Sequence, residues 1–158
     1  MNSIKWLSKY EEHPLFSVLE DSFVTNEKLI VKGNKGSFLN VLIAALQAKK
    51  SRKQLIIAND KEEAAYIFND IQNLLGERQA LYYPASLTSP YETSRTQNAN
   101  IIQRAEVLSE LNNNTKKIIV TYPEALLEKV ITQKEFTKNS HKIKVGETIP
   151  VLLEKIED

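Results

Sequence analysis

The chain has 158 residues, long enough to bury one hydrophobic core without disulfides or metal ions to stabilise it. Its 21 basic and 20 acidic residues nearly cancel, which excludes a global field that would attract nucleic acid or an anionic membrane surface. Cysteine is absent, which excludes disulfides, thiolate nucleophiles and cysteine-based metal sites and fits a reducing, cytoplasmic setting.

Two short segments of helical pattern come first in the chain. They span residues 4–10 and 15–21 and are separated by His13-Pro14, where a helix should break because proline disfavours helix in the preceding residue. Their apolar side chains would pack on the rest of the molecule, so residues 1–27 are interpreted as an N-terminal helical segment. We expect His13 at the surface, in a polar turn, rather than in catalysis.

A loop with two of the chain's four glycines connects an apolar run to an apolar helix. Residues 29–31 predict the first strand, Gly33 and Gly36 lie in the loop, and Ser37 is expected to cap a helix over residues 38–49. Strand, glycine loop and helix form the layout of a phosphate-binding loop, in which backbone N–H groups and the helix N-terminus surround an anion.

The side chains of that chemistry are missing. Counted from Gly33, the last three positions of the pattern G-x-x-x-x-G-K-[ST] hold Phe38, Leu39 and Asn40. The lysine that reaches the phosphates and the hydroxyl that binds magnesium are therefore absent, which leaves backbone N–H groups and nearby lysines as a poor substitute. We expect no nucleotide cofactor and no metal at this degenerate phosphate loop, made of Gly33, Gly36, Ser37, Phe38, Leu39 and Asn40.

Residues 54–58 predict the second strand, and a helix with clear start and stop signals follows it. Asp60 is expected to cap that helix, and Glu63 three residues later completes a capping box. Gly76 is expected to end the helix as its C′ residue. Between them, apolar residues recur at helical spacing and predict one buried stripe of Ala64, Ile67, Phe68, Ile71, Leu74 and Leu75.

The third predicted strand, residues 80–83, leads into a polar loop bounded by prolines. Loops of this length are uncommon in compact domains and are often functional. Tyr83, Tyr91 and Arg95 lie in or beside it, a mixture suited to stacking on bases and contacting phosphate. The alternative, which we favour, is that the tyrosines pack the loop on the domain and that Arg95 pairs with Glu92.

A long helix is predicted over residues 95–112, with an inward face formed by Ile101, Ile102, Ala105, Leu108 and Leu111. Residues 116–121 predict the fourth strand. Pro123 then takes the first position of another helix, whose apolar face continues to Ile131. Proline suits that position because a backbone N–H there would have no acceptor within the helix, so its absence costs no hydrogen bond.

Strands and helices alternate along the whole chain. Residues 141–145 alternate like a further strand, and residues 150–158 have the pattern of a helix that has only begun. Such alternation indicates βαβ units. We therefore expect an α/β fold, a three-layer domain with a mainly parallel sheet and helices on both faces.

No catalytic constellation stands out. The two histidines, His13 and His141, are far apart in sequence, and neither has the context of a nucleophile elbow. No apolar run approaches the roughly 20 residues of a membrane span, so we expect no membrane partner. We accordingly predict no catalytic residue in this chain.

Basic residues gather at the end of the helix over residues 38–49, in the loop after it, and again at the start of the fourth strand. They are a candidate surface for DNA or a protein partner. Basic residues also suit the negative end of a helix dipole, and for those that follow residue 48 the interpretation that we favour is a solvated helix end and loop. Together with the residues of the polar loop, the candidate contacts are Lys49, Lys50, Arg52, Lys53, Tyr83, Tyr91, Arg95, Lys116 and Lys117.

The order of these parts resembles one protein family. The telling segments are Gly-Asn-Lys-Gly-Ser before the apolar helix, Leu-Tyr-Tyr-Pro-Ala with Ser-Pro-Tyr-Glu after the third strand, and Lys-Ile-Ile-Val-Thr-Tyr-Pro-Glu-Ala-Leu-Leu at the fourth. Over residues 18–158 the chain resembles the N-terminal UvrB-homologous region of the bacterial transcription-repair coupling factor, Mfd. The resemblance implies a RecA-like fold of the P-loop NTPase class with a decayed phosphate loop.

The family is an ATP-dependent DNA translocase that displaces stalled RNA polymerase and recruits the repair protein UvrA. Its ATP and magnesium belong to motor domains further along the protein. The resemblance implies that residues 28–145 are a helicase-like domain without catalysis and that residues 146–158 begin an inserted, here truncated, UvrA-binding domain. UvrA, RNA polymerase and DNA would be partners through the parent protein, and other domains of the same protein would pack on this one.

The resulting hypothesis is a non-catalytic module that contributes to UvrA recruitment and regulation in transcription-coupled nucleotide excision repair. Two alternatives stay open. One is a nucleotide-binding RecA-like domain with an unusual loop, and the other is a DNA-binding RecA-like domain of another helicase-related protein.

Overall fold

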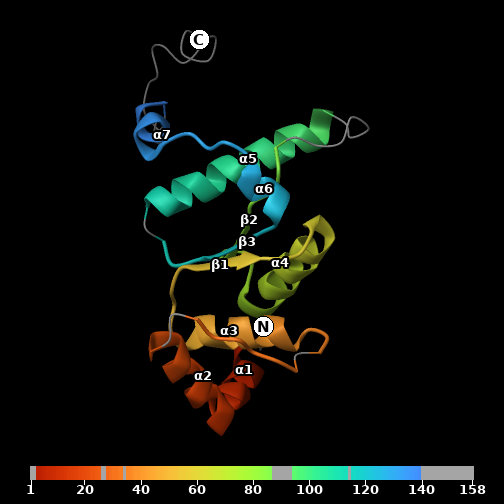
Figure 1. Ribbon diagram of the computed structural model, residues 1–158, viewed down its shortest axis with the longest axis vertical. Coiled ribbons are helices and arrows are strands. Elements are labelled where there is room, and N and C mark those ends of the chain that lie inside the picture. The colour runs from red at the N-terminus through yellow and green to blue at the C-terminus, as the bar shows by residue number, and fades with distance from the viewer. Residues whose placement is uncertain (1–2, 26–27, 34, 87–93, 114, 140–158) are drawn as a thin grey trace.

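A parallel sheet of three strands lies at the centre of the molecule, with β1 (Gln54–Ile57), β3 (Ile118–Thr121) and β2 (Ala80–Tyr82) in that order. Each parallel connection needs a crossover helix, which is why helices and strands alternate in the sequence. The α/β class and the parallel sheet are confirmed. The computed structural model, shown in Figure 1, describes residues 3–25, 28–33, 35–86, 94–113 and 115–139.

Helices lie on both faces of the sheet. The crossover from β1 to β2 is α4 (Lys61–Leu75), on one face. The crossover from β2 to β3 is α5 (Ser94–Asn112), on the other face together with α6 (Pro123–Leu127), and α7 (Gln133–Asn139) lies beyond them (Figure 1). The central strand β3 is therefore covered from both sides.

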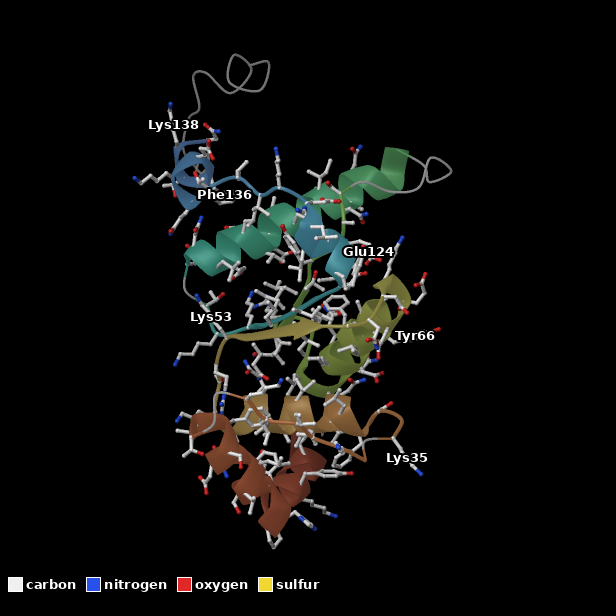
Figure 2. All side chains as sticks on the ribbon, in the orientation of Figure 1. Lys35, Lys53, Tyr66, Glu124, Phe136 and Lys138 are labelled. Carbon is white, nitrogen blue, oxygen red and sulfur yellow. The ribbon has the colours of Figure 1, made fainter. Side chains whose placement is uncertain are left out.

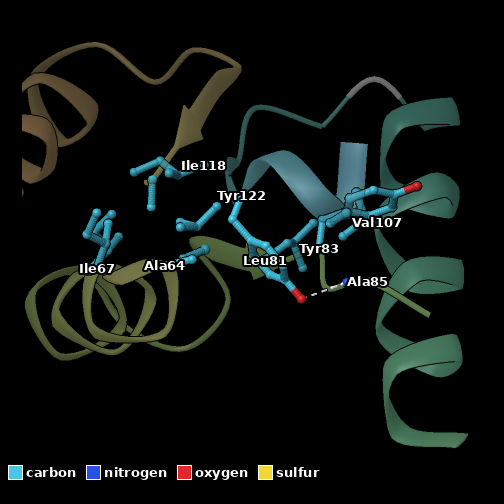
Figure 3. Packing of buried hydrophobic residues seen from close by; sticks show 13 residues of the cluster. Ala64, Ile67, Leu81, Tyr83, Ala85, Val107, Ile118 and Tyr122 are labelled. Carbon is cyan, nitrogen blue, oxygen red and sulfur yellow. Dashed lines mark hydrogen bonds between the residues drawn. The ribbon is translucent and has the colours of Figure 1, made fainter. Parts of the chain in front are cut away.

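The main core surrounds this central strand. Ile118 and Val120 of β3 are fully buried. In Figure 3, Ile67 of α4 lies on one side of the cluster and Val107 of α5 on the other. The predicted stripe of α4 is largely confirmed, since its alanine and isoleucine positions are buried and its phenylalanine and second leucine pack against the core.

The first three helices form a second group that packs on α4. They are α1 (Ser3–Glu11), α2 (Pro14–Thr25) and α3 (Phe38–Lys49), so the predicted pair of N-terminal helices and the break before Pro14 are confirmed. Their shared core consists of Leu7, Phe16, Leu42, Ala44, Ala45 and Leu46, with Leu74 and Leu75 of α4 packed against it. The division into domains stays a prediction.

Residues 29–31 form no strand, so the prediction of a first strand there is wrong. Ile30 is 68% exposed, and the described residues 28–33 take no part in the sheet. An apolar triplet becomes a strand only where neighbouring strands pair with it. α3 packs mainly on α1 and α4, so the segment that leads into it lies beside the helical layer and pairs with no described strand.

The predicted inward face of α5 is wrong for its two isoleucines, whereas Leu108 of that face is half-buried and lines a hollow beside the sheet. Ile101 and Ile102 are 54% and 68% exposed, whereas Asn100, Arg104 and Val107 are buried. A polar pair decides the orientation, because Arg104 turns toward the sheet to meet buried acceptors. The spacing of apolar residues in the sequence could not predict this orientation, because the acceptors of Arg104 lie in other segments of the chain.

The helix predicted from Pro123 is shorter than expected. Pro123 begins α6 as predicted, but α6 ends at Leu127, and Val130 and Ile131 follow it outside any helix, 47% and 52% exposed. The strand predicted over residues 141–145 and the helix predicted from residue 150 lie outside the described residues.

The predicted N-cap of α4 is confirmed, while the reciprocal bond of the predicted capping box goes to the residue before the cap. Asp60 accepts a hydrogen bond from the backbone N–H of Glu63 at 2.8 Å, and Glu63 in turn accepts one from the backbone N–H of Asn59 at 2.8 Å. Gly76 ends the helix at φ 97°, a conformation that residues with a Cβ rarely adopt. The sequence signals at both ends of α4 therefore act as predicted.

Replacing the cap tests this local assignment. Asp60→Ala removes the acceptor for the Glu63 N–H and is expected to lower the free energy of unfolding by about 1 kcal/mol. Asp60→Asn keeps an acceptor oxygen and serves as the matched control, expected to change stability by only a few tenths of a kcal/mol. Urea unfolding followed by circular dichroism measures both, and an equal loss in the two variants would contradict the capping role.

Candidate functional site

The loop before α3 turns the chain through its own backbone hydrogen bonds. Gly33 and Gly36 take positive φ of 88° and 56°, as a tight turn into a helix requires. The N–H of Phe38 donates to the carbonyl of Lys35 at 3.4 Å, while Ser37 occupies the N-cap position without a side-chain capping bond. Lys35 extends away from the body of the molecule in Figure 2. The predicted cap position is thus right, and its expected hydrogen bond is not made.

Asn40 stands where a phosphate loop has its magnesium-binding hydroxyl, and it serves a different purpose. Its side chain is buried, and its Nδ2 donates a 2.7 Å hydrogen bond to Oδ2 of Asp70 in α4. Phe38 and Leu39 beside it are 46% and 39% exposed. This position therefore ties α3 to α4. Asp70 had no sequence signal that marked it, because only the fold brings it opposite Asn40.

A buried glutamine forms hydrogen bonds with the two basic segments, the loop after α3 and the residues before β3. Gln47 is 2% exposed, and its Nε2 donates to the carbonyl of Lys116 at 2.9 Å. Its Oε1 accepts from Nε2 of Gln54 at 2.6 Å and from the backbone N–H of Arg52 at 3.3 Å. The loop after α3 and Lys116, two residues before β3, consequently meet at the amino end of the sheet. Sequence reasoning predicted these basic residues as contacts but missed Gln47, which resembles any other polar residue of a helix.

Two of the predicted basic contacts are already paired. Nζ of Lys49 lies 2.7 Å from Glu20, and Nζ of Lys117 lies 2.8 Å from Glu110. The hydrogen bond from Lys117 is the largest cause that holds the pKa of Glu110 below its usual value, and the bond from Lys49 does the same for the pKa of Glu20. Their charge is thus compensated within the chain.

The other basic residues that were predicted as contacts differ in how far their side chains are exposed. Lys50, Lys53 and Lys116 are exposed and carry no ion pair in the part of the chain that the structure describes. Arg52 is half-buried, and its Nε is buried with no hydrogen-bond partner among the residues that the structure describes. Arg95 belongs to α5, with its side chain outside the description. Tyr91 and Glu92 lie outside the described residues, so the predicted pairing of Arg95 with Glu92 does too.

Arg104 forms the centre of a polar cluster at the carboxyl end of β2. Its Nη1 donates to the carbonyl of Pro84 at 2.7 Å and to that of Ala125 at 3.3 Å, and it lies 3.2 Å from the carboxylate of Glu128. Glu128 also accepts a 2.6 Å hydrogen bond from Oγ of Ser86. One guanidinium thereby connects the turn after β2 with α6 and the residue that follows it. Neither Arg104 nor Glu128 was marked by the sequence pattern.

Tyr83 lies inside this cluster. A side chain that stacks on nucleic-acid bases would have to lie at the surface. It is 6% exposed, and the guanidinium carbon of Arg104 lies 4.2 Å from its ring centroid. Its hydroxyl is buried without a hydrogen-bond partner in the described chain. Nearby, the N–H of Ala85 donates to the Tyr122 hydroxyl at 2.9 Å, the dashed line of Figure 3. For Tyr83, the structure confirms the alternative that we favoured, in which the tyrosine packs the loop on the domain.

Metal and membrane sites were also sought. Within the described ranges, no three histidine, cysteine or acidic residues come together as metal ligands. No helix in the described part of the chain is both long and apolar enough to cross a membrane. Apart from the Tyr83 hydroxyl, the polar side chains of the cluster around Arg104 are bonded to one another and to backbone, so the arrangement holds the turn after β2 in place.

Comparison with known proteins adds one relationship. The chain is 32% identical over 95 residues to the transcription-repair-coupling factor of Rickettsia conorii (strain ATCC VR-613 / Malish 7). The resemblance to a coupling factor is confirmed. The similarity covers 56% of this chain and only 8% of that protein, so the chain spans a small part of the length of the curated relative. No protein-family model and no solved structure match the chain.

A double-mutant cycle tests the polar cluster. Arg104→Met leaves the Glu128 carboxylate buried without its cation and should lower the free energy of unfolding by roughly 3–5 kcal/mol. Adding Glu128→Gln removes the uncompensated charge, so the double variant should be more stable than Arg104→Met alone. Urea unfolding of the four proteins gives the coupling energy. Simple additivity of the two single losses would show that the residues do not act as a pair.

Alkaline unfolding tests the half-buried phenol of Tyr82 and the buried phenol of Tyr83. Burial raises the pKa of Tyr82, with the neighbouring Tyr122 as a smaller cause, and burial also raises the pKa of Tyr83. A raised native pKa means that the stabilisation is complete below the unfolded value of about 10 and is lost as the pH rises above it. We expect the urea midpoint to fall above about pH 10, and to fall less steeply in Tyr82→Phe. Equal slopes in both proteins would contradict this assignment.

Proposed function

We propose that this chain is the UvrB-like part of a transcription-repair coupling factor and acts there as a non-catalytic RecA-like module. In this role it contributes to UvrA recruitment and regulation during transcription-coupled nucleotide excision repair. The parent protein supplies the ATP-dependent translocation on DNA and the displacement of stalled RNA polymerase. The similarity to a coupling factor supports this proposal, and so does the α/β fold with its parallel sheet.

The observation that carries the non-catalytic part is the hydrogen bond between Asn40 and Asp70. A working phosphate loop needs a free hydroxyl for magnesium at this position and a lysine one residue earlier. Here the amide is bonded into the interface of α3 and α4, and the earlier position holds the half-exposed Leu39. The segment before the loop is also outside the sheet, so the loop does not follow a sheet strand.

Binding to UvrA tests the recruitment role directly. Purified chain is titrated onto immobilised UvrA in biolayer interferometry, and we expect saturable binding that UvrB competes away, because the module is proposed to be UvrB-like. Absence of binding would contradict a contribution of these residues to recruitment. Binding that UvrB leaves unchanged would contradict the UvrB-like mode.

Nucleotide titration tests the degenerate loop. Calorimetry with magnesium-ATP is expected to show no binding at millimolar ligand, because no positioned lysine or metal ligand meets the phosphate charge. Leu39→Lys restores only the lysine and should not produce ATP hydrolysis above buffer. Saturable magnesium-ATP binding by the unmodified chain would favour the alternative of a nucleotide-binding domain.

A DNA-binding role is the second candidate. It is supported by the exposed Lys50, Lys53 and Lys116, since Gln47 bonds the backbone of Arg52, in the loop that holds Lys53, and that of Lys116 at one end of the sheet. Fluorescence anisotropy with a labelled duplex decides between the two. Phosphate contacts by these lysines would give an affinity that falls steeply with salt. For the module proposed above, we expect no binding at physiological salt.

A further inference from the structure

One half of the sheet face beneath α5 is bare. The register pairs Leu55 of β1 with Ile119 of β3, so these side chains share a face, and Leu55 and Ile57 are 58% and 55% exposed on it. α5 packs over β2, and α6 ends at Leu127 before reaching across β1. Parallel strands are normally covered on both faces, so an uncovered apolar strand of this kind marks a surface that another element occupies.

The bare half-face borders an apolar hollow of about 440 Å³. Leu55 and Ile119 line it from the sheet, Val107 and Leu108 from α5, and Leu126 from α6. A second hollow of about 260 Å³ lies between α5 and α7 and shares Leu108 with the first. Because the two hollows also share Leu111, they adjoin along the carboxyl half of α5, and together they are called the groove below.

At the sheet edge of the groove, the charge that no partner compensates is positive. Glu110 and Glu128 adjoin the groove and are neutralised by Lys117 and Arg104 respectively, while the carboxylate of Glu135, at the α7 end, accepts hydrogen bonds from Thr132. Lys53 lines the groove at the edge of the sheet, where Figure 2 shows it extending outward, and it has no ion pair among the described residues. The exposed Lys129 adjoins the groove-lining Val130, and Lys116 is held at the same end of the sheet by Gln47.

We propose that this groove docks an amphipathic helix from outside the chain, with an apolar stripe toward Leu55 and Leu126 and an acidic flank toward Lys53. A helix fits because the layer that covers this face, formed by α5 and α6, is helical and stops short of β1. The apolar stripe covers exposed sheet surface, and the acidic flank meets cations that no carboxylate of the described chain neutralises. This interaction goes beyond the proposed function and does not depend on it.

A selection experiment tests the chemistry of the occupant. Displayed peptides of about 18 residues, with leucine fixed along one helical stripe and the other positions randomised, are selected on the immobilised full chain. We expect the selected flanks to be enriched in aspartate and glutamate. Enrichment of basic or neutral flanks would overturn the proposal.

Variants then place the binding site. The best selected peptide is synthesised with a dye, and its Kd is measured by fluorescence anisotropy. Lys53→Glu and Val130→Asp should each weaken binding about tenfold or more, because the first repels the acidic flank and the second places a charge in the groove. Both positions are exposed and outside helices, so the fold should survive, which the urea midpoint confirms. Tyr66→Asp is the control, since Tyr66 is 74% exposed on α4, across the sheet from the groove (Figure 2).

Three results would overturn the proposal. The first is equal affinity in Lys53→Glu, Val130→Asp and the unmodified chain. The second is a peptide affinity that rises about tenfold when residues 146–158 are deleted, which would make the chain's own end the occupant. The third is a dimer in light scattering that Leu55→Asp dissociates, which would make a second copy of the chain the occupant.

Discussion

The buried guanidinium of Arg104 determines how α5 and α6 are arranged on the sheet. It is bonded to carbonyls of the turn after β2 and of α6 and paired with Glu128, so α5 must turn that side to the sheet. A buried charge without these partners would cost several kcal/mol, so no rotation of α5 that breaks them is competitive. The consequence is that isoleucines of α5 face outward and that the helix covers β2 but leaves β1 bare.

A second constraint acts at the amino end of the chain. α3 packs between α1 and α4, and Asn40 is bonded to Asp70 across that interface. The glycine loop therefore leads into a helix that packs mainly on other helices and meets the sheet only at the amino ends of its strands. The segment before the loop forms no strand, and the loop lacks the lysine and the hydroxyl of the phosphate-loop pattern.

Local signals made much of the fold predictable from the sequence. Asp60, Glu63 and Gly76 set the limits of α4 through contacts with residues a few positions away, and such contacts can be inferred from spacing. The strand at residues 29–31 and the inward face of α5 were predicted wrongly because both depend on partners distant in sequence. Asp70, Gln47 and Glu128 escaped notice for the same reason, since their roles exist only once the chain has folded.

The central claim is that the glycine loop is retained for its shape and binds no phosphate. Amide NMR of the chain during addition of magnesium-ATP tests it most directly, because the N–H groups of Gly33, Gly36 and Ser37 would be the ones to meet the phosphates. The account predicts that their chemical shifts do not move. Saturable shifts confined to these three amides would contradict it.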